Sequence, residues 1–166
     1  MSLVRSIEEL EDGVPSALSR FGNPLTTNNN SLIYSLFALR LKAGEQEAIM
    51  RIIDMTILCT SNATYNYFIL KNPNVVGTPF SWLSYGLTKK FEYDNLRNNN
   101  TTVNGGELIL GGCNNEGNQA GSSFIHYVKK EFALFNGISS DELVFGVQRA
   151  AGGAETFYAN VNLSEK

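Results

Sequence analysis

Two alternating runs near the C-terminus constrain the fold of this chain more than any other part of the sequence. Within residues 143–148, and again within residues 157–163, an apolar side chain occupies every second position. A period of two is typical of a β-strand with one buried face. The stretch AAGGAE between the two runs is rich in small residues and is longer than a two-residue hairpin loop. The pattern therefore predicts an antiparallel β-hairpin.

The same pattern of strand-forming runs separated by turns extends toward the N-terminus as far as about residue 31. Runs rich in β-branched and aromatic residues, such as SLIYSLFALRLKA and YNYFILKN, are separated by turns that contain Asn, Gly and Pro. Residues 123–135 fit a strand or a helix, and we favour a strand because the neighbouring elements are β. About eight strands with long connections favour a two-sheet jelly roll over an immunoglobulin sandwich. We therefore predict an all-β fold, an antiparallel β-sandwich of jelly-roll type.

Residues 1–30 differ from the rest of the chain. An acidic start, SIEELEDG, is followed by Pro15, Pro24 and a run of asparagines, which interrupt any regular element. We predict an extended N-terminal arm at 1–30 and a jelly-roll β-sandwich domain at 31–166, so that a chain beginning near residue 28 should still fold. A disordered leader is the alternative reading of the arm. The apolar residues of the arm are suited to a partner's pockets, and they are the partner-binding candidates: Leu3, Val4, Ile7, Leu10, Leu18 and Phe21.

Composition argues against several classes of function. The net charge is −3 and the pI is near 5.2, whereas nucleic-acid binding requires clustered Lys and Arg, so no nucleic-acid partner is expected. No run approaches the ~18 apolar residues of a membrane span, and the N-terminus lacks the apolar core of a signal peptide. We expect a protein that is made in a cytoplasm and does not enter a membrane, with Cys59 and Cys113 as thiols.

The residues that could carry chemistry are few and scattered. His126 is the single histidine and lies in an aromatic run, FIHYV, which favours a structural role. One histidine and two cysteines, far apart in the sequence, do not match the ligand spacing of a zinc site. The Gly-rich stretches lack the GK[ST] ending of a phosphate loop. We therefore expect no enzyme activity, no metal and no cofactor. A carbohydrate-binding module remains an alternative, with residues 72–80 and 95–105 as recognition loops.

Several segments resemble a family of small structural proteins of tailed bacteriophages. The resemblance rests on NNNSLIYSLFALRLKAG, NPNVVGTPFSWLS, TVNGGELILGG and GISSDELVFGVQRAAGGAETFYANVNL, and it covers about residues 28–163. The matching positions are 30–42, 70–78, Trp82, 93–94, 103–106, 140–144 and 155–158. The shared motifs consist of turn and strand residues and carry no catalytic meaning.

The resemblance implies a jelly-roll domain and a place on the phage particle. On this basis we expect a non-enzymatic virion structural protein, foremost a capsid decoration (cement) or head-fibre subunit. It would form a homotrimer and bind the major capsid protein, or another virion protein, through its N-terminal arm. The alternatives are a tail, neck or baseplate component and, from another class, a carbohydrate-binding module for host attachment. The expected location is the virion, after synthesis in the cytoplasm of the host bacterium.

Overall fold

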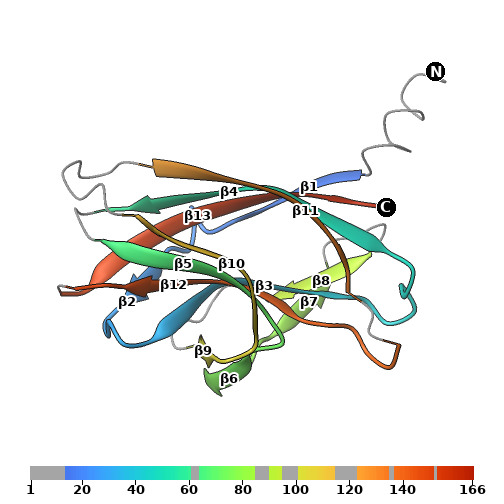
Figure 1. Cartoon of the computed structure of the whole chain (residues 1–166), viewed down its shortest axis with the longest axis horizontal. Coiled ribbons are helices and arrows are strands. Elements are labelled where there is room, and N and C mark those ends of the chain that lie inside the picture. Colours follow the sequence, from blue (N-terminus) through green and yellow to red (C-terminus); the bar gives the residue numbers. More distant parts are fainter. Residues whose placement is uncertain are drawn as a thin grey trace.

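A computed structural model describes residues 14–60, 64–84, 90–94, 101–114, 123–134, 137–151 and 153–166, and these ranges contain strands and no helix (Figure 1). The strands are β1 (Val14–Ser19), β2 (Leu25–Thr27), β3 (Ile33–Leu41), β4 (Ile49–Cys59), β5 (Tyr65–Lys71), β6 (Asn74–Gly77), β7 (Trp82–Ser84), β8 (Phe91–Asp94), β9 (Thr101–Asn104), β10 (Glu107–Asn114), β11 (Ser123–Ala133), β12 (Leu143–Arg149) and β13 (Glu155–Glu165). All pairings between them are antiparallel. The predicted all-β antiparallel class is confirmed, and the ambiguous segment at 123–135 contains a strand, as expected.

The strands form two sheets that lie face to face as a β-sandwich (Figure 1). The five-stranded sheet has the order β1-β13-β4-β11, and β2 pairs with the first residues of β13. The eight-stranded sheet has the order β10-β5-β12-β3-β8-β7, and the pair β6–β9 joins it through β3. The connections from β3 to β4, β4 to β5, β10 to β11, β11 to β12 and β12 to β13 each cross from one sheet to the other. The chain therefore closes the sandwich around one shared core.

The main hydrophobic core lies between the two sheets. The predicted C-terminal hairpin is wrong, because β12 and β13 lie in different sheets and do not pair with each other. The two strands instead face each other across the core, and both contribute the positions that the period of two predicted: Leu143, Phe145 and Val147 on β12, and Phe157, Ala159, Val161 and Leu163 on β13. The rings of Phe37 and Phe145 meet edge to face, with centroids 6.3 Å apart, which is a favoured geometry for aromatic pairs. Alternation along the chain thus becomes a buried inner face in the fold.

Strand β4 needs a bulge to keep its apolar residues in this core. Ile52 and Met55 are both fully buried although they lie three residues apart, an odd spacing that would place them on opposite faces of a regular strand. The register of β4 against β13 shifts between these two residues and skips Ile53. Ile53 is therefore the extra residue of a β-bulge, which returns the next residues of β4 to the inner face.

A second, smaller core covers the outer face of the eight-stranded sheet. Its buried members are Ala38, Leu70, Val103 and Val144, with Ile33, Phe68, Phe80 and Trp82 packed against them. Much of this cover comes from the segment between β5 and β10, which contains β6 to β9. We assigned parts of this segment to loops, whereas β6 and β9 are short paired strands. Their Val and Thr residues favour strands, but each strand has only four residues and is flanked by Asn, Gly or Pro, which are typical of loops.

The N-terminal boundary of the sandwich also differs from the prediction. Strand β1 pairs with β13 from Val14, opposite Glu165, to Ser19, opposite Asn160. Residues 14–30, which we assigned to an arm, therefore contain two strands of the five-stranded sheet, and residues 1–13 lie outside the described residues. The prolines misled the prediction, because an edge strand such as β1 tolerates a residue without an N–H group.

Candidate functional site

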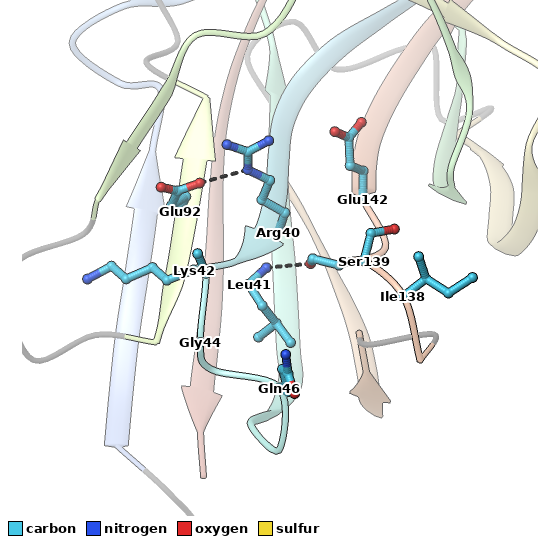
Figure 2. A pocket seen from close by; sticks show the side chains of 11 residues that line it. Arg40, Leu41, Lys42, Gly44, Gln46, Glu92, Ile138, Ser139 and Glu142 are labelled. Atoms are coloured by element: carbon cyan, nitrogen blue, oxygen red, sulfur yellow. Dashed lines mark hydrogen bonds and ion pairs between the residues drawn. The ribbon is translucent and has the colours of Figure 1, made fainter.

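A polar cleft of about 610 Å³ opens at one end of the sandwich (Figure 2). Its walls come from the end of β3 and the loop after it, from β8, and from the loop between β11 and β12. The lining side chains are Arg40, Leu41, Lys42, Gln46, Glu92, Ile138, Ser139, Ser140 and Glu142. These segments converge because β3 pairs with β8 on one side and with β12 on the other.

Arg40 occupies the middle of the charged part of the cleft. It lies directly opposite Glu92 in the β3–β8 ladder, and its Nε donates to Glu92 Oε2 at 2.7 Å (Figure 2). Its Cζ atom lies 4.4 Å from the ring centroid of Trp82, so a cation–π contact holds the guanidinium from a second side. Because Arg40 and Glu92 are both partly exposed, their ion pair contributes at most about 1 kcal/mol. Its main effect is to fix the direction of the guanidinium.

Glu142 lies across Arg40 from Glu92 (Figure 2). Partial burial raises the pKa of the Glu142 carboxyl above its ordinary value, and the opposing effect of the Arg40 charge is smaller. Glu142 therefore keeps its proton to a higher pH than an exposed glutamate does. A protonated carboxyl can donate a hydrogen bond, whereas a carboxylate only accepts. The cleft thus combines hydrogen-bond donors and acceptors suited to polar groups of a ligand or a partner.

The loop between β11 and β12 is anchored by hydrogen bonds at its C-terminal end. Asn72, just after β5, donates from Nδ2 to Asp141 Oδ1 at 2.7 Å and accepts the Glu142 N–H at Oδ1 at 2.8 Å. The Leu41 N–H, at the end of β3, donates to Ser140 Oγ at 2.7 Å. Asp141 is buried, at 4 % exposure. The two neighbouring strands of the sheet therefore determine where this wall of the cleft lies.

The same loop carries a strongly exposed apolar side chain at the margin of the cleft. Ile138 is 93 % exposed, the largest value among the large hydrophobic residues in the described part of the chain. It lies four residues after Leu134 and three residues before Asp141, and both of these are buried. The loop thus presents one branched aliphatic side chain beyond a fixed base.

The predicted partner-binding residues do not gather at this cleft. Leu18 is buried in the main core at 2 % exposure, so its side chain supports the fold. Phe21 is 51 % exposed, and its ring stacks on that of Tyr158 with centroids 6.2 Å apart. The other four candidates, Leu3, Val4, Ile7 and Leu10, lie outside the described residues.

Sequence reasoning missed the residues that form the cleft. Arg40, Glu92 and Glu142 are separated by about fifty residues each along the chain, and no local motif links them. Ile138 left a weak signal, because it is a lone aliphatic residue within the polar turn NGISSD. Single apolar residues are common on protein surfaces, so this residue could not be assigned to a contact surface from the sequence alone.

Side-chain groups suited to a metal ion and helices suited to a membrane are both absent from the described ranges. Within them, no group of three or more His, Cys, Asp or Glu side chains could hold a metal ion. No helix in this part of the chain is long and apolar enough to cross a membrane. Cys59 is buried on β4 and Cys113 is exposed on β10, and the two are not joined by a disulfide, as expected.

No protein-family model, curated protein or solved structure significantly matches the chain.

Proposed function

We propose that this chain is a non-enzymatic structural protein of a tailed-phage virion, in particular a capsid decoration (cement) subunit. It binds the outer shell as a homo-oligomer, with a homotrimer as the expected form. Its partners are further copies of itself and the major capsid protein or another virion protein. It acts on the particle, after synthesis in the host cytoplasm.

The order of the strands is the observation that carries this proposal. If β1, β3, β4, β5, β10, β11, β12 and β13 are taken as the main strands and numbered one to eight, one sheet reads 1-8-3-6 and the other 2-7-4-5. Strand one then pairs with eight and three with six in one sheet, and two pairs with seven and four with five in the other, as in the two Greek keys of a jelly roll. We therefore infer a sandwich of jelly-roll type. Jelly rolls recur in viral capsid proteins and in lectins.

The positions shared with the phage family provide a second line of support for the proposal. Several of them build the junction where β5, β10 and β12 meet. Asn72 has a positive φ of 50° and bridges to Asp141 and Glu142. Gly106 has a φ of 80°, and a Cβ there would meet the Lys71 carbonyl oxygen at 2.7 Å. The motifs thus have structural reasons to recur in proteins with this junction.

The proposal is tested by the abundance of the protein in purified particles of the phage whose genome encodes it. Quantitative mass spectrometry should find it at a copy number within a small factor of that of the major capsid protein. A copy number at a small fraction of that value would instead indicate a tail, neck or baseplate component. Absence from the virion, together with specific binding on a glycan array, would overturn the proposal in favour of a carbohydrate-binding module.

A further inference from the structure

The end of the sandwich that holds the polar cleft also contains the start of β1. Val14 lies opposite Glu165 in the β1–β13 ladder. The next residue, Lys166, exchanges two backbone hydrogen bonds with Ile49, at 2.9 and 3.2 Å. Lys166 also lines a neighbouring hollow with residues 44–48, and this hollow shares Gly44 and Gln46 with the cleft. The residues that precede Val14 in the sequence therefore join the sandwich at the cleft end.

We name this region the cleft-end face and define it by Arg40, Lys42, Gln46, Glu92, Ile138 and Glu142. We propose that the cleft-end face is the surface of the sandwich that docks on the shell protein, with Ile138 as its apolar anchor. The inference rests on the proposed function and adds the location of the contact. Residues 1–13 can span roughly 45 Å when extended, so they can contact the same partner from the edge of this face.

The chemistry of the face favours a protein partner. An isoleucine side chain makes no hydrogen bonds, so it gains free energy on binding only when an apolar pocket removes it from water. Around it lie both cations and carboxylates, among them the Arg40–Glu92 pair, which resembles the polar rim of a protein interface. A nucleic-acid surface would require an excess of positive charge, and a sugar offers hydroxyl groups in place of an apolar pocket.

The loop that bears Ile138 is suited to act as a preformed anchor. Its base is closed by the Asp141 N–H, which donates to the carbonyl oxygen of Leu134. Further hydrogen bonds from Asn72 and to Ser140 hold it against β5 and β3. An exposed side chain on a fixed base loses less conformational entropy on binding than one on a mobile loop. Such anchors dominate the affinity of many interfaces.

The experiment uses full-length protein and particles of the encoding phage that were assembled without it. Ile138→Asp should weaken binding to these particles at least about tenfold in a co-sedimentation titration, as expected when the apolar anchor of an interface is replaced by a charge. Leu32→Asp is the matched control, because Leu32 is another exposed aliphatic residue and precedes the opposite end of β3 from Arg40 and Leu41. It should bind within about twofold of the unmodified protein.

Failure of this inference can be distinguished from failure of the proposed function. Ile138→Asp should retain its circular dichroism and melting temperature, since Ile138 is 93 % exposed, and Ile138→Ser provides a milder change if Ile138→Asp does not fold. Leu32 is only 38 % exposed, so the control variant is used after circular dichroism has shown that it is folded. If the unmodified protein binds and the Ile138 variants bind equally well, the cleft-end face is not the docking surface, although the proposed function stands. If the unmodified protein neither binds the particles nor occurs in virions, the proposed function fails, and the inference fails with it.

Discussion

Asn72 combines three structural tasks in one residue. Its φ of 50° lies in the left-handed region, where Asn is tolerated much better than most residues with a Cβ. Its amide bonds to Asp141 and Glu142, and its backbone N–H donates to the Glu142 carbonyl at 2.8 Å. The side chain therefore joins the end of β5 to the start of β12 while its backbone makes the turn.

Replacing Asn72 should separate these tasks. We expect Asn72→Ala to lower the free energy of unfolding by about 2–3 kcal/mol, from about 1 kcal/mol per lost hydrogen bond and about 1 kcal/mol for Ala in the left-handed region. Asn72→Gly loses the same side-chain bonds but tolerates the positive φ, so it should be the less destabilised variant. Urea unfolding of both variants measures the difference. Equal losses would show that backbone conformation contributes nothing at this position.

Glu142 should make stability depend on pH in a specific direction. Because its pKa is raised in the folded protein, the folded state binds this proton more tightly than the unfolded state does. Its contribution to stability is therefore fully present below the ordinary glutamate pKa and is lost as the pH rises through the raised value. Glu142→Gln removes this titration.

The matching measurement is the difference in unfolding free energy between Glu142→Gln and the unmodified protein. This difference should shift in favour of the variant as the pH rises from the ordinary glutamate pKa through the raised pKa of Glu142, because only the unmodified protein loses a proton at this position. The comparison cancels the titration of the other carboxyl groups, which both proteins share. A difference that stays constant with pH would contradict the raised pKa.

At the scale of elements, the first two strands are part of the five-stranded sheet, so a chain that begins at residue 31 should not fold. It would lose β1 and β2 with two core side chains, Leu18 and Leu25, which are 2 % and 0 % exposed. Burial of each contributes about 1.5–3 kcal/mol, and the β1–β13 ladder is lost as well. Together, these lost contributions approach the free energy of unfolding of a typical domain, which is about 5–15 kcal/mol.

Two truncations test this expectation. A chain starting at Val14 retains all the described strands and should show β-type circular dichroism with a cooperative melt. A chain starting at Ser31 should be unfolded or aggregated under the same conditions. If both chains melted cooperatively at the same temperature, β1 and β2 would be dispensable, and the boundary first inferred from the prolines would be restored.

The elements that could be predicted from the sequence are those whose burial follows local periodicity. Strand β13 has this property, because its buried residues alternate with half-buried ones over most of its length. In β12 the inward-facing apolar residues recur with the same period, although both faces of that strand are buried. Strand β1 does not, because its Pro and Ser residues carry no β signal and its pairing is supplied by β13, more than 140 residues away in the sequence. The bulge at Ile53 could not be predicted either, since it depends on registers with two neighbouring strands.

At the scale of the whole molecule, the cleft could not be predicted from the sequence, because three segments that are far apart in the chain form it. Arg40 and Glu92 meet through a cross-strand pair, and Glu142 joins them through the pairing of β12 with β3. In the sequence, each of these three residues looks like an ordinary charged residue of a protein surface. Only the sheet order, which results from the global arrangement of the strands, brings them together at one end of the sandwich.

The place of β13 in the five-stranded sheet has a consequence for how the protein is made. This strand lies between β1 and β4 and pairs with both, and it also pairs with β2. During translation, β1, β2 and β4 leave the ribosome long before the strand that joins them. Contacts so distant in sequence make folding slow, and an incomplete sheet leaves strand edges open to aggregation. The five-stranded sheet therefore stays incomplete until β13, which begins at Glu155, has been synthesised, and β4, which ends at Cys59, lacks one of its two neighbouring strands until then.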